Sequence, residues 1–192
     1  MIVDPYVSAI SGYLRSLGSG NITIVDLGCG DFRVGRNFVE LCASYQAVDV
    51  VPELIERHRL GNFGPHVIFH CLDIIEDELP AGDVCFVRQV FQHLSNAQIQ
   101  KILPKLSDYS IVFVTEHYPS DHVPAVWNLD KIHGADIRLY SKSGVYLDKP
   151  PFSLKAMGIE LFLEVSSAPV EDGGDVGVIR TFKIDMRSAL NS

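Results

Sequence analysis

A glycine turn at the end of an apolar run is the feature that most constrains this chain. Residues Ile22–Leu27 form a short apolar run typical of a buried parallel strand, and Gly28-Cys29-Gly30 follow directly. Glycines at such a turn let a ligand approach the backbone closely, and a helix after the turn offers its first N–H groups to that ligand. The sequence therefore predicts a ligand site at the carboxyl end of the first strand.

Strand and helix patterns alternate around this turn. An amphipathic helix is expected over residues 4–17, with Asp4 as its N-cap and Pro5 in its first turn. Further helices are expected after the glycine turn, from Pro52, and after the Ser95/Gln98 capping box. Strands are expected at residues 45–50, 67–71, 84–87 and 111–115. Such alternation predicts an α/β fold with a doubly wound, mostly parallel sheet covered on both faces.

The carboxyl-terminal part of the chain has a different pattern. Residues 160–165 and 176–184 are two extended runs joined through EDGGD, which has the composition of a hairpin turn. We therefore expect the sheet to end in an antiparallel pair. No repeat or second domain is evident, so residues 1–192 are interpreted as a single domain.

Two further aspartates follow the next two strands. Asp49 ends the second strand, 49 − 30 = 19 residues after Gly30, where a carboxylate can accept both hydroxyls of a ribose. Asp73 follows the third strand. A dinucleotide fold would need its third glycine at position 33, which is Arg33, and Asp26 would repel a pyrophosphate. The turn therefore favours a ligand with a cationic end.

Five segments in register resemble the class I S-adenosylmethionine-dependent methyltransferases. VDLGCGDFRVG resembles the first motif of that family, and AVDVVPELIERHR, HCLDI, VRQVFQHLS and VFVTEH resemble the elements that follow, over about residues 22–117. The resemblance implies the Rossmann-like seven-stranded methyltransferase fold, methyltransferase activity, and S-adenosylmethionine as the cofactor. Phe32 is a departure, because the family often has glycine or a small residue there; it either narrows the pocket or packs the following helix.

The resemblance also implies which residues bind the cofactor. Asp26, Gly28 and Gly30 would hold its methionine part. Arg88 would line the methionine side near the methyl acceptor. Asp49 would bind the ribose, with Val50 against the adenine, and Asp73 and Ile74 would meet the adenine as well.

Residues 117–153 show no clear helical or strand period, and they contain the only tryptophan, Trp127. The fifth strand leads into this loop from the ligand side of the sheet, so we expect the loop to build the acceptor pocket. Its walls would be Trp127, Tyr118, Tyr140 and Tyr146. His117 and Glu116 are candidate proton acceptors, and His93 is a weaker candidate, often structural in the family.

Other chemistries have less support. His117, Asp121, His122 and His133 have no spacing that fixes a metal site, so solvated loop residues are the better interpretation. A net charge of −8 argues against non-specific nucleic-acid binding. The lack of an N-P-P-Y motif after the fourth strand argues against the nucleobase and glutamine branches of the family. We therefore expect a small-molecule acceptor, methylated on oxygen or nitrogen.

Composition also bears on the location of the protein. No apolar run approaches the ~20 residues that span a bilayer, and the first residues do not form a secretory signal. The four cysteines contain no C-x-x-C pair and are expected to be reduced and buried, so a cytoplasmic location is expected. They are Cys29, Cys42, Cys71 and Cys85.

Two alternatives stay open at this point. One is a catalytically silent S-adenosylmethionine-binding module, which Phe32 and the unusual loop support. The other is a nucleotide-dependent oxidoreductase, which the missing third glycine disfavours. The sequence leaves open the acceptor, the methylated atom and the oligomeric state.

Overall fold

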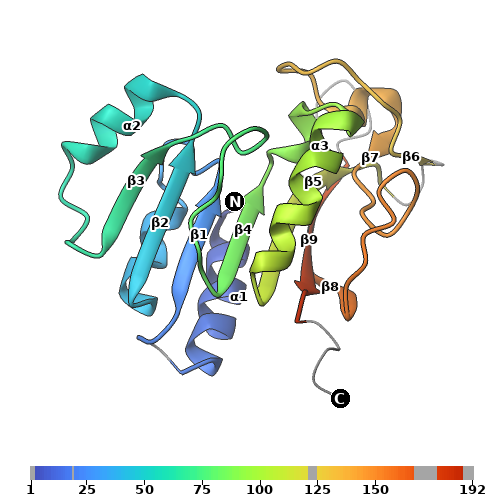
Figure 1. The fold of residues 1–192 in the computed structure, drawn as a ribbon. Coiled ribbons are helices and arrows are strands. Elements are labelled where there is room, and N and C mark those ends of the chain that lie inside the picture. Colours follow the sequence, from blue (N-terminus) through green and yellow to red (C-terminus); the bar gives the residue numbers. More distant parts are fainter. Residues whose placement is uncertain (1–2, 19, 121–124, 167–176, 188–192) are drawn as a thin grey trace.

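A seven-stranded sheet forms the centre of the computed structural model, which describes residues 3–18, 20–120, 125–166 and 177–187 (Figure 1). The strand order is β3-β2-β1-β4-β5-β9-β8. Strands β1 to β5 pair in parallel, and β9 lies antiparallel between β5 and β8. The predicted doubly wound sheet with its antiparallel pair is therefore confirmed, while the whole EDGGD turn lies outside the described residues. The strands are β1 (Thr23–Leu27), β2 (Ser44–Asp49), β3 (Val67–Cys71), β4 (Val84–Arg88), β5 (Ile111–Tyr118), β8 (Gly158–Ser166) and β9 (Val178–Asp185).

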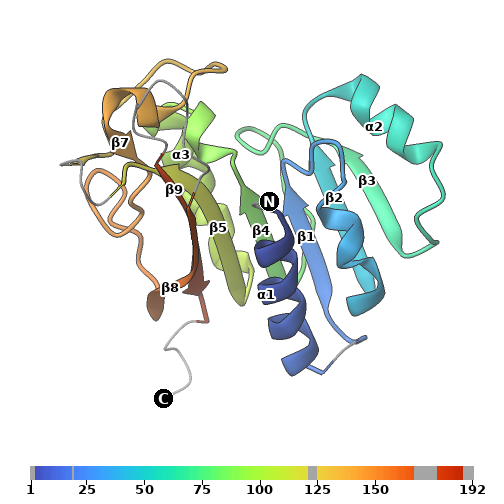
Figure 2. The same ribbon diagram turned by 180° about the vertical axis from the view of Figure 1, so that it is seen from behind.

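Helices cover both faces of the sheet (Figures 1 and 2). On one face lie α1 (Val3–Ser16), α2 (Pro52–Arg59) and two short 3-10 helices; on the other lie α3 (Asn96–Ile102) and the 3-10 helix η4 (Leu103–Asp108). Helix α1 buries Tyr6, Ile10 and Leu14 at helical spacing, as expected. Ser95 and Gln98 form the predicted capping box of α3.

The helix expected after the glycine turn is absent. The structure has two 3-10 helices there, η1 (Gly35–Asn37) and η2 (Val39–Leu41). The Asn37 amide donates to the carbonyls of Arg33 and Val34, both at 2.9 Å, so the side chain occupies oxygens that an α-helix would use for its backbone ladder. Phe38 and Val39 are nevertheless buried.

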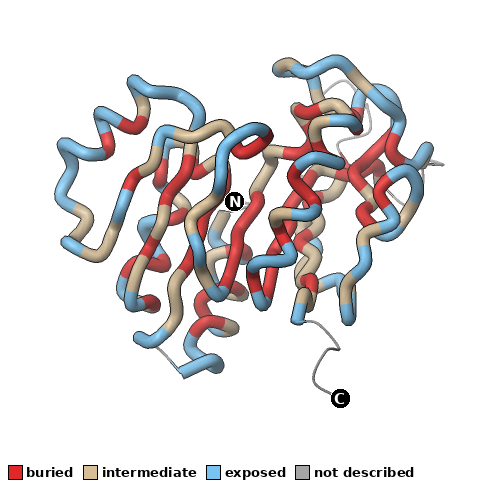
Figure 3. Tube along the Cα trace, viewed as in Figure 1, coloured by how far each residue is buried: buried red, intermediate tan, exposed pale blue. Residues whose placement is uncertain are grey.

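Two hydrophobic clusters lie on opposite faces of the sheet, because neighbouring strand residues point to opposite sides. In β1, for example, Val25 joins the cluster under α3, whereas Ile24 joins the one under α1. Strands β1, β4 and β5 are therefore buried along most of their length (Figure 3). Cys71 is an exception to the buried cysteines that the sequence predicted; it lies exposed at the end of the edge strand β3.

Side chains that bond to backbone carbonyls help to order the segment between β5 and β8. The Asn128 amide donates to the carbonyls of Tyr146, Lys149 and Pro150, and the Tyr118 hydroxyl donates to that of Val145 at 2.7 Å. The segment also holds a two-stranded parallel pair, β6 (Val126–Trp127) with β7 (Ser143–Gly144), and the 3-10 helix η5 (Arg138–Ser141). None of the described helices is long and apolar enough to cross a membrane.

Candidate functional site

The glycine turn after β1 is held against β2. The N–H groups of Gly28 and Cys29 both donate to the Val48 carbonyl, at 2.8 and 2.9 Å. Gly28 has a φ of +78°, and a Cβ built on it would lie 2.4 Å from Cγ2 of Val90. Both the left-handed backbone and the close approach of Val90 therefore require glycine at this position.

Asp49 ties the turn to the end of β2. Its Oδ2 accepts from the Gly30 N–H at 2.9 Å and its Oδ1 accepts from the Val51 N–H at 3.1 Å. The carboxylate borders a cavity of about 290 Å³, here called the Asp49 cavity. Its walls bring together the four residues that the sequence predicted for ribose and adenine, namely Asp49, Val50, Asp73 and Ile74. Its other lining residues are Gly28, Leu72, Ile75, Gln89, Val90, His93, Leu94 and His133.

Asp73 stabilises a turn whose residues form one wall of this cavity. Its Oδ1 accepts from the Ile75 N–H at 2.8 Å, and its N–H donates to Oδ2 of Asp77 at 2.8 Å. The turn presents Leu72, Ile74 and Ile75 to the cavity. Carboxylates at one end and aliphatic walls at the other suit a ligand with a hydroxylated part and a flat apolar part.

A second cavity, of about 250 Å³, lies on the other side of the turn and is here called the Asp26 cavity. The buried Asp26 carboxylate accepts from the Tyr45 hydroxyl at 2.9 Å. Burial raises the pKa of Asp26 to about 6, although the Tyr45 bond and Arg88 oppose the rise. A cationic ligand group would compensate the buried charge. The lining residues are Tyr6, Asp26, Gly28, Cys29, Gly30, Asp31, Arg33, Val34, Gly35, Phe38, Phe86, Arg88 and Gln89.

Arg88 gives the Asp26 cavity a positive group as well. Its guanidinium lies 5.4 Å from the centroid of the Tyr6 ring, and its buried Nε has no hydrogen-bond partner within the described part of the chain. A guanidinium and a carboxylate lining one cavity suit a ligand end that carries both a negative and a positive charge. The predicted residues Asp26, Gly28, Gly30 and Arg88 are thus brought together here.

Gln89 joins the two cavities, and sequence reasoning missed it. It lines both, its N–H donates to the Thr115 carbonyl at 2.7 Å, and its φ of +55° is a conformation that residues with side chains rarely adopt. Backbone strain of this kind concentrates at functional sites. Tyr6 was also missed as a site residue, because its place on the apolar face of α1 identified it only as a core residue.

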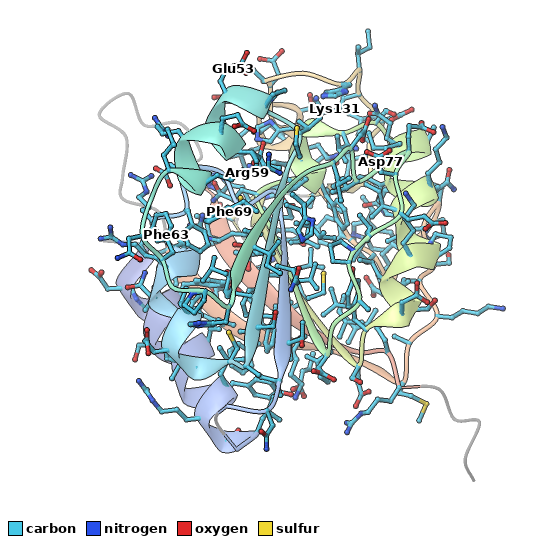
Figure 4. All side chains as sticks on the ribbon, turned by 60° about the vertical axis from the view of Figure 1, so that its left-hand side comes forward. Glu53, Arg59, Phe63, Phe69, Asp77 and Lys131 are labelled. Carbon is cyan, nitrogen blue, oxygen red and sulfur yellow. The ribbon has the colours of Figure 1, made fainter. Side chains whose placement is uncertain are left out.

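Behind the turn, an aromatic cluster fixes its position. The His58 Nε2 lies 2.8 Å from the Gly30 carbonyl, and the His58 ring stacks on Phe69 with centroids 5.1 Å apart. Phe32 packs edge-to-face against Phe63 and Phe69, which Figure 4 labels on the β3 side of the molecule. Phe32 lines neither cavity, so its large side chain packs the core and does not narrow the site.

The three candidate catalytic residues lie in different places. Glu116 is fully buried, and its carboxylate accepts from the N–H groups of Val90, Phe91 and Gln92 at 2.8–3.3 Å. Burial raises its pKa to about 8. Its proposed role as a proton acceptor for substrate is therefore corrected: the carboxylate anchors the 3-10 helix η3 (Phe91–His93) and is closed to a ligand.

His117 and His93 also lie in different parts of the structure. His117 is half-buried near the end of β5, and strand alternation places it on the α1 face with Thr115, the residue that pairs with Arg88. His117 therefore lies on the same face of the sheet as Asp26. His93 lines the Asp49 cavity, and its Nδ1 lies 3.3 Å from the Gly134 carbonyl, so it is placed away from Asp26.

The residues expected to wall the acceptor pocket lie mostly outside the two cavities. No described residue of 117–153 lines the Asp26 cavity, and only His133 lines the Asp49 cavity. Trp127 is 57% exposed, and Tyr118 and Tyr146 border a separate small cavity. Asp121 and His122 lie outside the described residues, and among those described no cluster of three or more His, Cys, Asp or Glu side chains is arranged to hold a metal ion.

Comparisons with known proteins identify the fold. No protein-family model matches the sequence, and no curated protein sequence does. Among solved structures, the chain is similar to the methyltransferase domain of bacterial CtHen1-CN, with 13% identity and a TM-score of 0.64 over 96% of this chain and 100% of that one. It is also similar to the N-methyltransferase NodS from Bradyrhizobium japonicum in complex with S-adenosylhomocysteine, with 14% identity and a TM-score of 0.62 over 94% and 88%.

A third similar structure is human N-acetylserotonin methyltransferase in complex with S-adenosylmethionine, with 12% identity and a TM-score of 0.59 over 93% of this chain and 50% of that one. At such low identity the likeness concerns the arrangement of the elements. The mostly parallel sheet with its antiparallel β9 belongs to this shared arrangement, which extends over 93–96% of the chain. The chain therefore has the Rossmann-like fold of the class I S-adenosylmethionine-dependent methyltransferases, as its motifs predicted.

Proposed function

We propose that this protein is an S-adenosylmethionine-dependent methyltransferase that acts on a small-molecule acceptor. One observation carries the proposal: two cavities of unlike chemistry meet at Gly28 and Gln89. The Asp49 cavity has the acidic and aliphatic groups that a nucleoside requires, and the Asp26 cavity has the paired charges that an amino-acid end requires. Two of the similar structures hold S-adenosylmethionine or S-adenosylhomocysteine, which has these two ends.

The residues present fit this cofactor. Each oxygen of Asp49 accepts one backbone N–H, which leaves a further lone pair on each for the two ribose hydroxyls. The adenine would lie against Val50 and Ile74. Asp26 would hold the cationic side of the methionine part, and the guanidinium of Arg88, which lines the same cavity, would donate to a carboxylate near it.

The proposed mechanism asks the protein mainly for positioning. When bound, the sulfonium supplies its own leaving-group activation for an in-line methyl transfer. The chain would orient it through Asp26 and Asp49 and exclude water through the packing of Tyr6 over Arg88. For a hydroxyl acceptor, His117 would take the proton that the acceptor loses, because a neutral imidazole is suited to this near pH 7.

A catalytically silent module that only binds the cofactor is the remaining alternative. One of its two sequence grounds was Phe32, whose side chain packs in the core. The small-molecule acceptor is favoured by the acidic charge of the chain and by the lack of an N-P-P-Y motif. A turnover assay against a panel of hydroxylated and amino metabolites distinguishes enzyme from silent module.

Calorimetry with S-adenosylmethionine and S-adenosylhomocysteine tests the binding proposal. Asp49→Ala should weaken both by about 10–150-fold, because a hydrogen bond to a charged group contributes about 1.5–3 kcal/mol. Asp83→Ala is the matched control, since Asp83 also accepts a strand N–H, from Thr23 at 2.7 Å, but at the opposite end of β1 and outside both cavities. Unchanged affinity in a folded Asp49→Ala protein would remove the ribose assignment, and no binding by the wild type would refute the proposed function.

A further inference from the structure

Residues 128–138, here called the strap, are clamped onto η3 and the start of α3. Asn96 donates from its backbone to Asp130 Oδ1 at 2.7 Å and from its side chain to the Asn128 carbonyl at 2.8 Å. The Lys131 ammonium and the Gly134 N–H both donate to the His93 carbonyl, at 3.2 and 3.1 Å. Figure 4 shows Lys131 at the same end of the molecule as Glu53 at the start of α2, which is the carboxyl edge of the parallel strands.

The clamp places one side chain of the strap at the Asp49 cavity. His133 lines that cavity together with Asp49, Asp73 and His93, although it comes from a distant part of the sequence. The His93 ring is itself tied to the strap, because its Nδ1 can bond the Gly134 carbonyl only by donating a proton. The position of His133 is therefore set by bonds on both sides of it in the chain.

The capping box of α3 determines which nitrogen of His133 carries the proton. Gln98 Oε1 accepts from the Ser95 N–H at 2.9 Å, so the other end of the Gln98 amide is the NH₂ group. This NH₂ group lies 3.1 Å from Nδ1 of His133 and must be the donor. Nδ1 is therefore an acceptor, and the neutral ring carries its proton on Nε2, for which the described residues offer no acceptor.

We propose that His133 recognises the base of the bound cofactor by donating its Nε2–H to a ring nitrogen of adenine. The proposal rests on the proposed function and deepens it. Adenine carries three ring nitrogens at its edges that accept hydrogen bonds, and the aliphatic side chains of Val50, Ile74 and Ile75 in the cavity wall carry no donor for them. The strap then completes the nucleoside half of the site, which differs from the acceptor role expected for residues 117–153.

Binding of S-adenosylhomocysteine and its 1-, 3- and 7-deaza analogues, which each replace one ring nitrogen by carbon, tests this. The wild type should bind one analogue about 3–10-fold more weakly than the parent, the net effect of one hydrogen bond. His133→Ala should weaken the parent by the same factor and bind that analogue no more weakly than the parent. His133→Gln, whose amide NH₂ replaces the Nε2 donor, should restore the discrimination.

His70→Ala is the matched control, because His70 also bonds a glutamine, Gln46 Oε1 at 2.7 Å, but lines neither cavity. It should bind all four ligands like the wild type. Wild-type affinity for the parent in His133→Ala, or discrimination that persists in this variant, would overturn the proposal. If the wild type binds none of the four ligands, the proposed function fails together with this inference.

Discussion

The carboxyl edge of strands β1 to β4 and the segment between β5 and β8 are both ordered, but by different bonds. At the strand edge, backbone pairing sets the positions: Asp26 lies opposite Ala47, and Asp49 lies opposite Cys71. In the segment, side chains supplement the short β6–β7 pair: Asn128 and Arg138 donate to backbone carbonyls that lie outside the strands. The first kind of order follows from apolar runs that are visible in the sequence, whereas the second follows from single polar residues.

This difference suggests that the two regions have different roles, ligand binding at the strand edge and stability in the segment. The strand edge supplies most of the residues that line the two cavities, whereas the described part of the segment supplies one, His133. Changes at the strand edge should therefore affect binding or chemistry, and changes in the segment should affect mainly stability.

The largest effect is expected where the two regions meet, at His117. If the acceptor is a hydroxyl, His117→Ala should lower kcat by about 10²–10⁴-fold, the usual loss for a general base, with cofactor affinity nearly unchanged. Turnover at saturating cofactor and calorimetric affinity measure the two separately. His66→Ala is a suitable control, because His66 bonds the Val39 carbonyl and precedes β3, at the opposite edge of the sheet from Asp26 and Asp49. Normal kcat in His117→Ala would assign that histidine a structural role.

Gly28→Ala should produce the next largest effect. The new Cβ would meet Val90 at 2.4 Å on a left-handed backbone, so the turn must move, at a cost of about 2–4 kcal/mol, and cofactor affinity should fall by about 30–1,000-fold. Gly12→Ala is the control: Gly12 lies in α1 with open space around it, and alanine there should raise the free energy of unfolding by about 0.5–1 kcal/mol. A Gly28→Ala protein that binds normally would show that the turn is not the binding element.

Much of the strand edge was predictable from sequence. The apolar runs gave the strands, and Asp26, Asp49 and Asp73 line the cavities as expected because each stands at a strand end. The misassignment of Glu116 was avoidable, since neighbouring strand residues face opposite sides and Glu116 therefore cannot share the face of His117.

Other features of the structure could not be predicted from the sequence pattern. Gln89 is placed by an unusual backbone angle. His133 is placed by its bond to Gln98, 35 positions earlier, and by the bond of its neighbour Gly134 to His93, 41 positions earlier. The missing helix after the turn follows from the Asn37 amide, whose competition with the backbone depends on the local fold. Gln89 and His133 depend on tertiary contacts, and the Asn37 bonds on local competition with the backbone, and periodicity encodes neither.

Asn128→Ala tests how much the side-chain bonds of the segment between β5 and β8 contribute to stability. The side chain is buried and holds three carbonyls and the Tyr146 N–H, so its loss should lower the free energy of unfolding by about 2–3 kcal/mol, measured with urea. Cofactor affinity should fall by no more than about tenfold, the effect expected of one hydrogen bond from His133. Asn37→Ala, an exposed asparagine with two similar bonds, should cost less than about 1 kcal/mol. If Asn128→Ala loses more free energy of cofactor binding than of unfolding, the two regions do not have the separate roles proposed.

The smallest effect, and the one that separates binding from stability most cleanly, is the pH response of Asp26. Its pKa is raised to about 6, first by burial and then by the nearby Asp49. A cationic ligand group prefers the ionised carboxylate, so cofactor affinity should be level above pH 6 and fall by up to about tenfold per pH unit below it. The stability of the free protein should respond in the opposite direction.

The direction of this change in stability follows from proton binding. A carboxyl whose pKa is raised on folding binds its proton more tightly in the folded state, so its stabilising contribution is full below pH 4 and is lost as the pH rises through 6. Glu116, with its pKa raised to about 8, changes stability in the same direction but touches no cavity. Asp26→Asn keeps Glu116 and the histidines, so the difference between its pH profiles and those of the wild type isolates Asp26. Identical affinity profiles in the two proteins would show that Asp26 does not meet the cationic end of the cofactor.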